Sequence, residues 1–169
     1  VLGELTGDKE LKCVVFLAEG RNWCAGVDVE DHKPDLVDEM IATFNVLLKN
    51  VEGCAVPTIA AVHGACLGGG MEVAIACDSI VAAKGASFGQ PEIKLGVFPP
   101  YAAIRLPQLI GPAKAIEVCT TGKRYSAEEA RRMGFVSTTV SDETFKEDLE
   151  KFIAEMTVNS PLIIRLNKR

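Results

Sequence analysis

The stretch HGACLGGGMEVAIACD (His63–Asp78) places three consecutive glycines between two apolar runs. The preceding run, VPTIAAV at 56–62, predicts a buried strand, and the run MEVAIAC at 71–77 predicts a helix. A strand, a glycine turn and a helix in this order leave the first N–H groups of the helix without partners inside it. These donors and the helix dipole favour negative charge at the turn.

Glu72 lies in the first turn of this predicted helix, beside those donors. Because glycine has no Cβ, a substrate carbonyl is able to approach the backbone closely at 68–70. An oxyanion site next to a carboxylate is a catalytic arrangement. In the alternative interpretation, the glycines serve tight packing and Glu72 only compensates the helix dipole. The turn by itself leaves both interpretations open.

The composition is that of an ordinary globular protein with a single domain over residues 1–169. Hydrophobic residues make up 48% of the chain and charged residues 24%. The net charge of -5 argues against a nucleic-acid partner. No apolar run reaches the roughly 18 residues of a membrane span, and the polar start VLGELTGDKE does not resemble a signal peptide. We therefore expect no membrane association.

The six cysteines form no CxxC pair and stand at no metal-ligand spacing with histidine. Five of them (Cys13, Cys54, Cys66, Cys77 and Cys119) lie in apolar runs. This pattern favours buried free thiols, a reducing cytoplasm and the absence of a metal site.

Apolar runs alternate with amphipathic segments along the chain, which predicts an α/β layered fold. Strands are expected at 13–20, 56–62, 79–83 and 135–140. Helices are expected from Pro34 to Gly53 and at 71–77, 101–111, 112–122, 126–134 and 143–156, with another starting near Pro161. Ser126 and Glu129 form a capping box, and residues 87–100 are expected to form a long loop. Both ends of the sequence resemble cut points.

Three loops follow buried strands: Trp23–Asp28, Gly64–Glu72 and Phe88–Pro100. In parallel α/β sheets such loops meet at one edge, so we expect them to converge. Amides near Ala25 and Gly69 would then hold one carbonyl oxygen as negative charge develops on it.

Glu92, in the third loop, stands between Pro91 and Ile93. This apolar setting is expected to raise its pKa, whereas Glu72 at a helix N-terminus is expected to ionise more easily. Two such carboxylates beside an oxyanion site suit acid–base chemistry next to a carbonyl.

The segments WCAGVDV, HGACLGGGMEVAIACD, SFGQPEIKLGVFP and TGKRYSAEEARRMGFVSTTV resemble successive motifs of the enoyl-CoA hydratase/isomerase (crotonase) superfamily. The resemblance covers residues 14 to about 140. It implies a crotonase-type spiral of ββα units with a core at about 13–140. Residues 141–169 would begin a C-terminal helical region, with the N-terminal and C-terminal parts of the domain missing.

The resemblance also implies an acyl-coenzyme A thioester substrate, no separate cofactor, and a homotrimer or hexamer. The thioester oxygen would be held by the amides of Ala25 and Gly69. Glu72 and Glu92 would activate water and protonate the α-carbon. The expected substrate-binding residues are Cys24, Gly26, Val27, Asp28, Gly68, Phe98, Pro100 and Tyr101.

The sequence departs from the family pattern after the QPE motif, which is Gln90–Glu92 here. The family has a glycine-rich run at this point, and this chain has Phe98–Ala103 instead. Pro100 has no N–H, so a donor supplied there by a glycine is lost. GVDVEDH and GVFPPYAA are most similar to the cyclohexa-1,5-diene-1-carbonyl-CoA hydratases of aromatic-acid degradation. A flat ring suits the aromatic side chains of Phe98 and Tyr101.

Two other functions remain open at this point. An isomerase would need one carboxylate to shuttle a proton, and a non-catalytic member would only bind acyl-CoA. His63 is interpreted as a structural histidine, His32 as a solvated one in an acidic loop, and Cys66 as a small packing residue.

Overall fold

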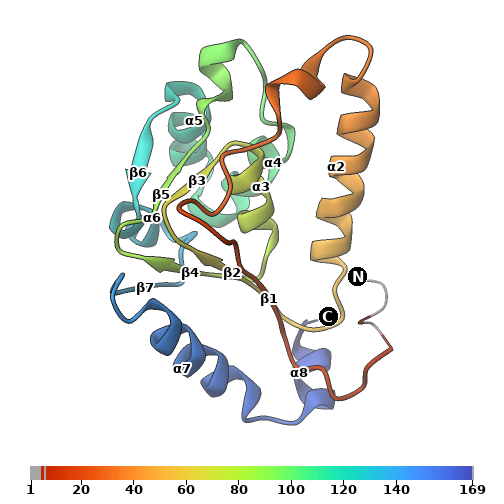
Figure 1. The fold of residues 1–169 in the computed structure, drawn as a ribbon, viewed down its shortest axis with the longest axis vertical. Helices are drawn as coiled ribbons and strands as arrows, with labels where there is room; N and C mark the ends of the chain where they lie inside the picture. Colours follow the sequence, from red (N-terminus) through yellow and green to blue (C-terminus); the bar gives the residue numbers. More distant parts are fainter. Residues whose placement is uncertain (1–4, 6, 169) are drawn as a thin grey trace.

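The computed structural model describes residue 5 and residues 7–168. One sheet joins four parallel strands in the order β1 (Val14–Phe16), β2 (Thr58–Val62), β4 (Ser79–Ala83) and β7 (Thr138–Val140). A second sheet joins β3 (Ala65–Leu67), β5 (Ser87–Gly89) and β6 (Arg124–Ser126). In it, β3 and β5 are parallel, and β6 is antiparallel to β5. Helices surround both sheets, which confirms the predicted α/β class (Figure 1).

The central strands of the first sheet are buried on both faces. Ile59 and Ala61 of β2 pack with Leu149 of α7 (Phe145–Thr157). The alternate residues Ala60 and Val62 face the main core, which includes α3 (Gly69–Ala76). Figure 1 shows α7 and α3 on opposite sides of this sheet. Because successive side chains of a strand alternate between faces, two buried faces require the continuous apolar run of the sequence.

Most of the predicted helices are present: α2 (Val37–Glu52), α4 (Pro100–Ile110), α5 (Pro112–Thr121), α6 (Ala127–Met133), α7 and α8 (Pro161–Lys168). The capping box of α6 is confirmed, with both of its hydrogen bonds formed. The predicted start of α2 at Pro34 is wrong. Lys33, before the proline, is extended, as residues preceding proline prefer, and Pro34 lies in a turn before the helix.

The expectation of a plain loop at 87–100 is also wrong. This segment contains β5 and the 3-10 helix η2 (Pro91–Leu95), and β3 stands between β2 and the glycine turn. β3, β5 and β6 are three residues long and, unlike the equally short β1 and β7, do not lie in a longer apolar run, so the sequence did not indicate them. A further 3-10 helix, η1 (Val29–His32), precedes α2.

None of the helices in the described residues has the length and hydropathy needed to cross a membrane. The expectation that the chain is cut near Val1 falls on residues outside the described range.

Candidate active site

The loop at Trp23–Asp28 lies against β3 and the glycine turn. The backbones of Cys24 and Cys66 pair as an isolated parallel β-bridge. The Cys24 amide donates to the Ala65 carbonyl at 3.1 Å, and the Leu67 amide donates to the Cys24 carbonyl at 2.9 Å. The first two predicted loops therefore converge, as expected from their positions after buried strands.

The glycines allow this close approach. A Cβ on Gly70 would lie 2.5 Å from the Cys24 carbonyl oxygen, and a Cβ on Gly26 would lie 3.6 Å from the Gly69 nitrogen. Gly69 is the first residue of α3, where a helix has no internal acceptor for the N–H. In the described part of the chain, neither the Ala25 nor the Gly69 amide donates to a backbone carbonyl. Both amides are thus available to an external oxygen atom.

Glu72 projects from the first turn of α3 and is only 3% exposed. Its Oε1 accepts hydrogen bonds from the N–H groups of Tyr101 at 2.9 Å and Ala102 at 2.8 Å. Burial raises the pKa of Glu72 to about 7, and the nearby charge of Glu92 adds to this, although the two hydrogen bonds act in the opposite direction. The expectation that the helix N-terminus keeps Glu72 readily ionised is therefore wrong, because desolvation outweighs it.

Glu92, on η2, places its carboxyl group against the glycine turn. A Cβ on Gly68 would lie 2.5 Å from Glu92 Oε1. Burial raises the pKa of Glu92, as its apolar setting predicted, whereas the charge of His32 lowers it. The third loop therefore also reaches the site, and Glu92 is near enough for its charge to act on Glu72.

Gln90 contacts Glu92, and the sequence reasoning did not single it out. Its side chain is fully buried, and its amide, oriented with the NH2 group toward Glu92, donates to Oε2 at 2.9 Å and to Oε1 at 3.1 Å. The position of Gln90 two residues before Glu92 was the sequence signal that could have indicated this contact.

Pro100 does not deprive Glu72 of donors. It is the first residue of α4, where an N–H has no partner in the helix, and the next two residues supply the hydrogen bonds to Glu72. The Tyr101 hydroxyl donates to Glu52 at 2.6 Å, and Phe98 is 67% exposed. Substrate binding by Phe98, Pro100 and Tyr101 stays a prediction.

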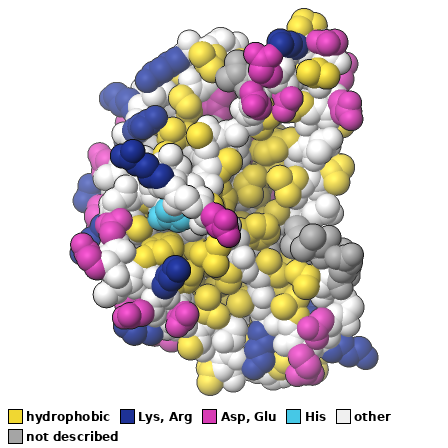
Figure 2. Space-filling model, viewed as in Figure 1, with side chains coloured by type: hydrophobic (Ala, Val, Ile, Leu, Met, Phe, Trp, Pro, Cys, Tyr) yellow, Lys and Arg dark blue, Asp and Glu magenta, His cyan; other side chains and the backbone are white. Residues whose placement is uncertain are grey.

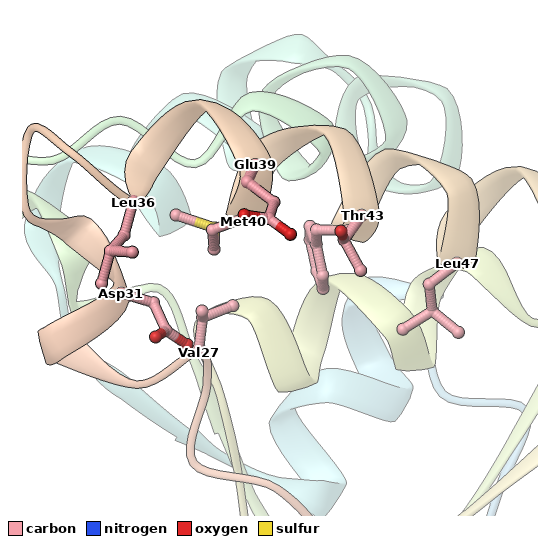
Figure 3. A pocket seen from close by; sticks show the side chains of 8 residues that line it. Val27, Asp31, Leu36, Glu39, Met40, Thr43 and Leu47 are labelled. Atoms are coloured by element: carbon pink, nitrogen blue, oxygen red, sulfur yellow. The ribbon is translucent and has the colours of Figure 1, made fainter.

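An apolar groove opens beside the site, between α2 and the loop before it. Its volume is about 360 Å³, and Figure 2 shows hydrophobic side chains gathered in the hollow along α2. Figure 3 shows the lining side chains of α2 pointing toward the loop that carries Val27. The lining residues are Val27, Asp31, Leu36, Glu39, Met40, Thr43, Phe44 and Leu47.

This groove adjoins the predicted oxyanion site. A Cβ on Gly69 would lie 2.9 Å from Val27 Cγ2 and 3.4 Å from Phe44 Cζ. The helical repeat of α2 is typical of a core-facing helix, yet only Leu48 and Val51 of the helix are buried. The apolar repeat of α2 favours core packing, so it did not indicate that this helix forms one wall of the groove.

The remaining candidates have structural partners. Asp28 caps η1 by accepting from the Glu30 amide at 3.0 Å. Cys66 is fully buried, and burial raises the pKa of its thiol well above the ordinary value, which suits packing rather than nucleophilic attack. His63 contacts the Gly20 carbonyl at 3.1 Å. Among the described residues, no group of three or more His, Cys, Asp and Glu side chains is arranged to hold a metal ion.

A family model for enoyl-CoA hydratase/isomerase matches residues 1–169. The chain belongs to this family. A cyclohexa-1,5-dienecarbonyl-CoA hydratase of Thauera aromatica is 38% identical over 141 residues, which are 83% of this chain and 55% of that protein. A short-chain-enoyl-CoA hydratase of Clostridium acetobutylicum is 32% identical over 174 residues, 100% of this chain and 67% of that protein.

The crotonase fold of this family is also found by comparison of structures. The crystal structure of an enoyl-CoA hydratase from Bacillus anthracis superposes with a TM-score of 0.94 at 32% identity. The superposition covers 99% of this chain and 67% of the Bacillus chain. The chain thus spans little more than half to two thirds of the length of these relatives.

Proposed function

We propose that this enoyl-CoA hydratase/isomerase family member adds water to the double bond of an α,β-unsaturated acyl-CoA thioester. The amides of Ala25 and Gly69 hold the thioester oxygen, and this stabilises the enolate charge that develops on it. Glu72, when ionised, takes a proton from the attacking water. Glu92 supplies the proton for the α-carbon.

The observation that carries this proposal is the pair of partly desolvated carboxylates beside two amides that have no backbone acceptor. A carboxyl group with a pKa near 7 exchanges protons readily at neutral pH. Gln90 donates two hydrogen bonds to Glu92 and so fixes its orientation. The apolar groove beside Gly69 suits the acyl part of the substrate.

For the acyl group, we propose a cyclic dienoyl thioester. The Thauera relative carries the name of a hydratase for such a substrate. A planar ring fits an apolar groove that has Phe44 on one side. A linear enoyl thioester is the competing substrate, because the Clostridium relative is named for short-chain substrates.

Hydration of crotonyl-CoA and of cyclohexa-1,5-diene-1-carbonyl-CoA, followed by loss of the conjugated enoyl absorbance, tests both points. We expect Glu92→Gln to lower turnover by roughly a hundredfold or more, the scale of a lost general acid. Glu117→Gln is the matched control, because Glu117 lies at the surface in an ion pair with Lys114. Unchanged turnover in Glu92→Gln would refute the two-carboxylate mechanism.

The same assays separate the other two functions. An isomerase would move a double bond without adding water and would tolerate Glu72→Gln. A protein that only binds acyl-CoA would bind both thioesters and turn over neither.

We also propose that the protein assembles into homotrimers or hexamers. Several large apolar side chains of α4, α5 and α8 are more than half exposed, which suits burial between copies. These are Ile104, Ile116, Leu162, Ile163 and Leu166. Light scattering coupled to size exclusion measures the assembly directly.

A further inference from the structure

Tyr101 contacts two glutamates through different groups. Its backbone N–H donates to Glu72 Oε1 at 2.9 Å, and its side-chain hydroxyl donates to Glu52 Oε1 at 2.6 Å. Glu52 is the last residue of α2, and Tyr101 is the second residue of α4. One residue therefore connects the predicted base to the end of a helix that lies 49 positions away in the sequence.

The first turn of α4 is held by packing and by one side-chain hydrogen bond. Pro100 is exposed and has no N–H to donate. Ala102 is fully buried, so its amide is held by packing in the main core. The ring of Tyr101 is partly buried against the main core, and its hydroxyl is hydrogen-bonded to the last residue of α2. The two amides that reach Glu72 thus belong to one fully packed residue and to one residue held by both packing and a hydrogen bond.

We infer that Tyr101 is a positioning residue: its hydroxyl, held by Glu52, keeps the N–H groups of residues 101 and 102 aligned on the Glu72 carboxylate. Hydrogen bonds to a carboxylate favour its ionised form. Because the proposed function requires Glu72 as an ionised base, the inference rests on that proposal for its catalytic consequence. Its effect on the acidity of Glu72 is independent of any reaction.

The other titratable groups around this hydrogen bond are few. Glu92 and Cys119 are near Glu72, since each influences or is influenced by its charge. Arg105 and Cys77 are near the Tyr101 hydroxyl. None of these changes in a Tyr101→Phe variant, which keeps the ring and removes only the hydroxyl.

The test is a pH titration of the free protein labelled with carbon-13 at the glutamate carboxyl groups, with Glu72→Gln used to assign the Glu72 signal. In Tyr101→Phe we expect the acid dissociation constant of Glu72 to fall by roughly threefold or more, the scale of weakened hydrogen bonds to a charged group. Glu52→Gln keeps an acceptor oxygen for the hydroxyl and should titrate like the unmodified protein. Glu52→Ala removes the acceptor and should reproduce Tyr101→Phe.

Steady-state hydration is measured on the same proteins. We expect kcat to fall by roughly three- to tenfold in Tyr101→Phe, with KM nearly unchanged and the acid limb of the pH profile moved to higher pH. The double variant Tyr101→Phe/Glu52→Ala should lose no more than either single variant. Tyr125→Phe, which removes the other tyrosine hydroxyl of the chain, should behave like the unmodified protein.

The two proposals fail separately. If the unmodified protein hydrates no enoyl-CoA, the proposed function is wrong, and the titration still decides the role of Tyr101. An unaltered Glu72 titration in Tyr101→Phe overturns the inference even in an active enzyme. So does a variant in which only KM rises, because that result would make Tyr101 a substrate contact.

Discussion

Replacing Gly68 by alanine tests the placement of Glu92 without altering either carboxylate. Gly68 has φ near +56° and ψ near -133°, a backbone conformation that residues other than glycine rarely adopt. A Cβ added there would lie 2.5 Å from Glu92 Oε1 and 3.2 Å from Cδ. The substitution therefore directs one methyl group at the carboxyl group of the predicted acid.

The size of the effect follows from these distances. Ordinary van der Waals contact begins near 3.4 Å, so the Oε1 atom must withdraw by about 0.9 Å. A displacement of about 1 Å at a reacting group costs roughly a hundredfold in rate. The backbone conformation adds roughly 1–3 kcal/mol of strain to the folded state.

Gly111→Ala is the matched control. Gly111 also has a positive φ, near +77° with ψ near 155°, but a Cβ there has no atom of the described residues within 4 Å. Urea unfolding should show a similar loss of stability in both variants, whereas a hydration assay should show a loss of kcat in Gly68→Ala alone. Equal activity in the two variants would mean that Glu92 does not need its observed position, and the reasoning from the site geometry would be wrong.

Three more predictions concern acidity, the groove and a helix cap. Since the pKa of Glu72 rises from 4.5 to about 7 on burial, the folded state binds the extra proton and loses stability as pH rises through this range. The stability of Glu72→Gln relative to the unmodified protein should thus rise by up to about 3 kcal/mol between pH 4.5 and 8, measured by urea unfolding at each pH. Met40→Trp should fill the groove and raise KM for ring or long-chain thioesters by roughly tenfold in steady-state assays, whereas Ile41→Trp, which is outside the lining, should not. Ser126→Ala removes the N-cap of α6 and should lower the free energy of unfolding by about 1 kcal/mol, with Ser126→Thr restoring most of it in urea titrations.

The elements predicted correctly are those whose own residues decide their structure. β2 and β4 are apolar along their length because helices cover both faces, and α6 carries a complete capping box. The elements that were missed depend on partners elsewhere in the chain. β5 and β6 are three residues each and exist because Ser87–Gly89 pairs with Arg124–Ser126 across a long separation in sequence.

The site divides in the same way. The convergence of the site loops could be predicted from their positions after strands, although the strands differ from those expected: β3 and β5 are parallel neighbours, and the Trp23–Asp28 loop joins them through the bridge between Cys24 and Cys66. The acidity of Glu72 could not, since it depends on how deeply α4 covers the carboxylate. The sequence places Glu72 in the first turn of a helix. It does not show how far tertiary packing removes water from the carboxyl group.

Gly69 and Glu72 belong to one short helix whose residues are almost all buried, and this has a mechanical consequence. The Gly69 amide, which we propose holds the thioester oxygen, and Glu72, the proposed base, therefore belong to a single rigid body, so their separation is expected to stay constant whichever thioester is held. Glu92 comes from a separate 3-10 segment with exposed neighbours, and its carboxyl group is oriented by Gln90 rather than by α3. On this scaffold we therefore expect a different reaction outcome to come from changes in the η2 segment, while α3 keeps its shape.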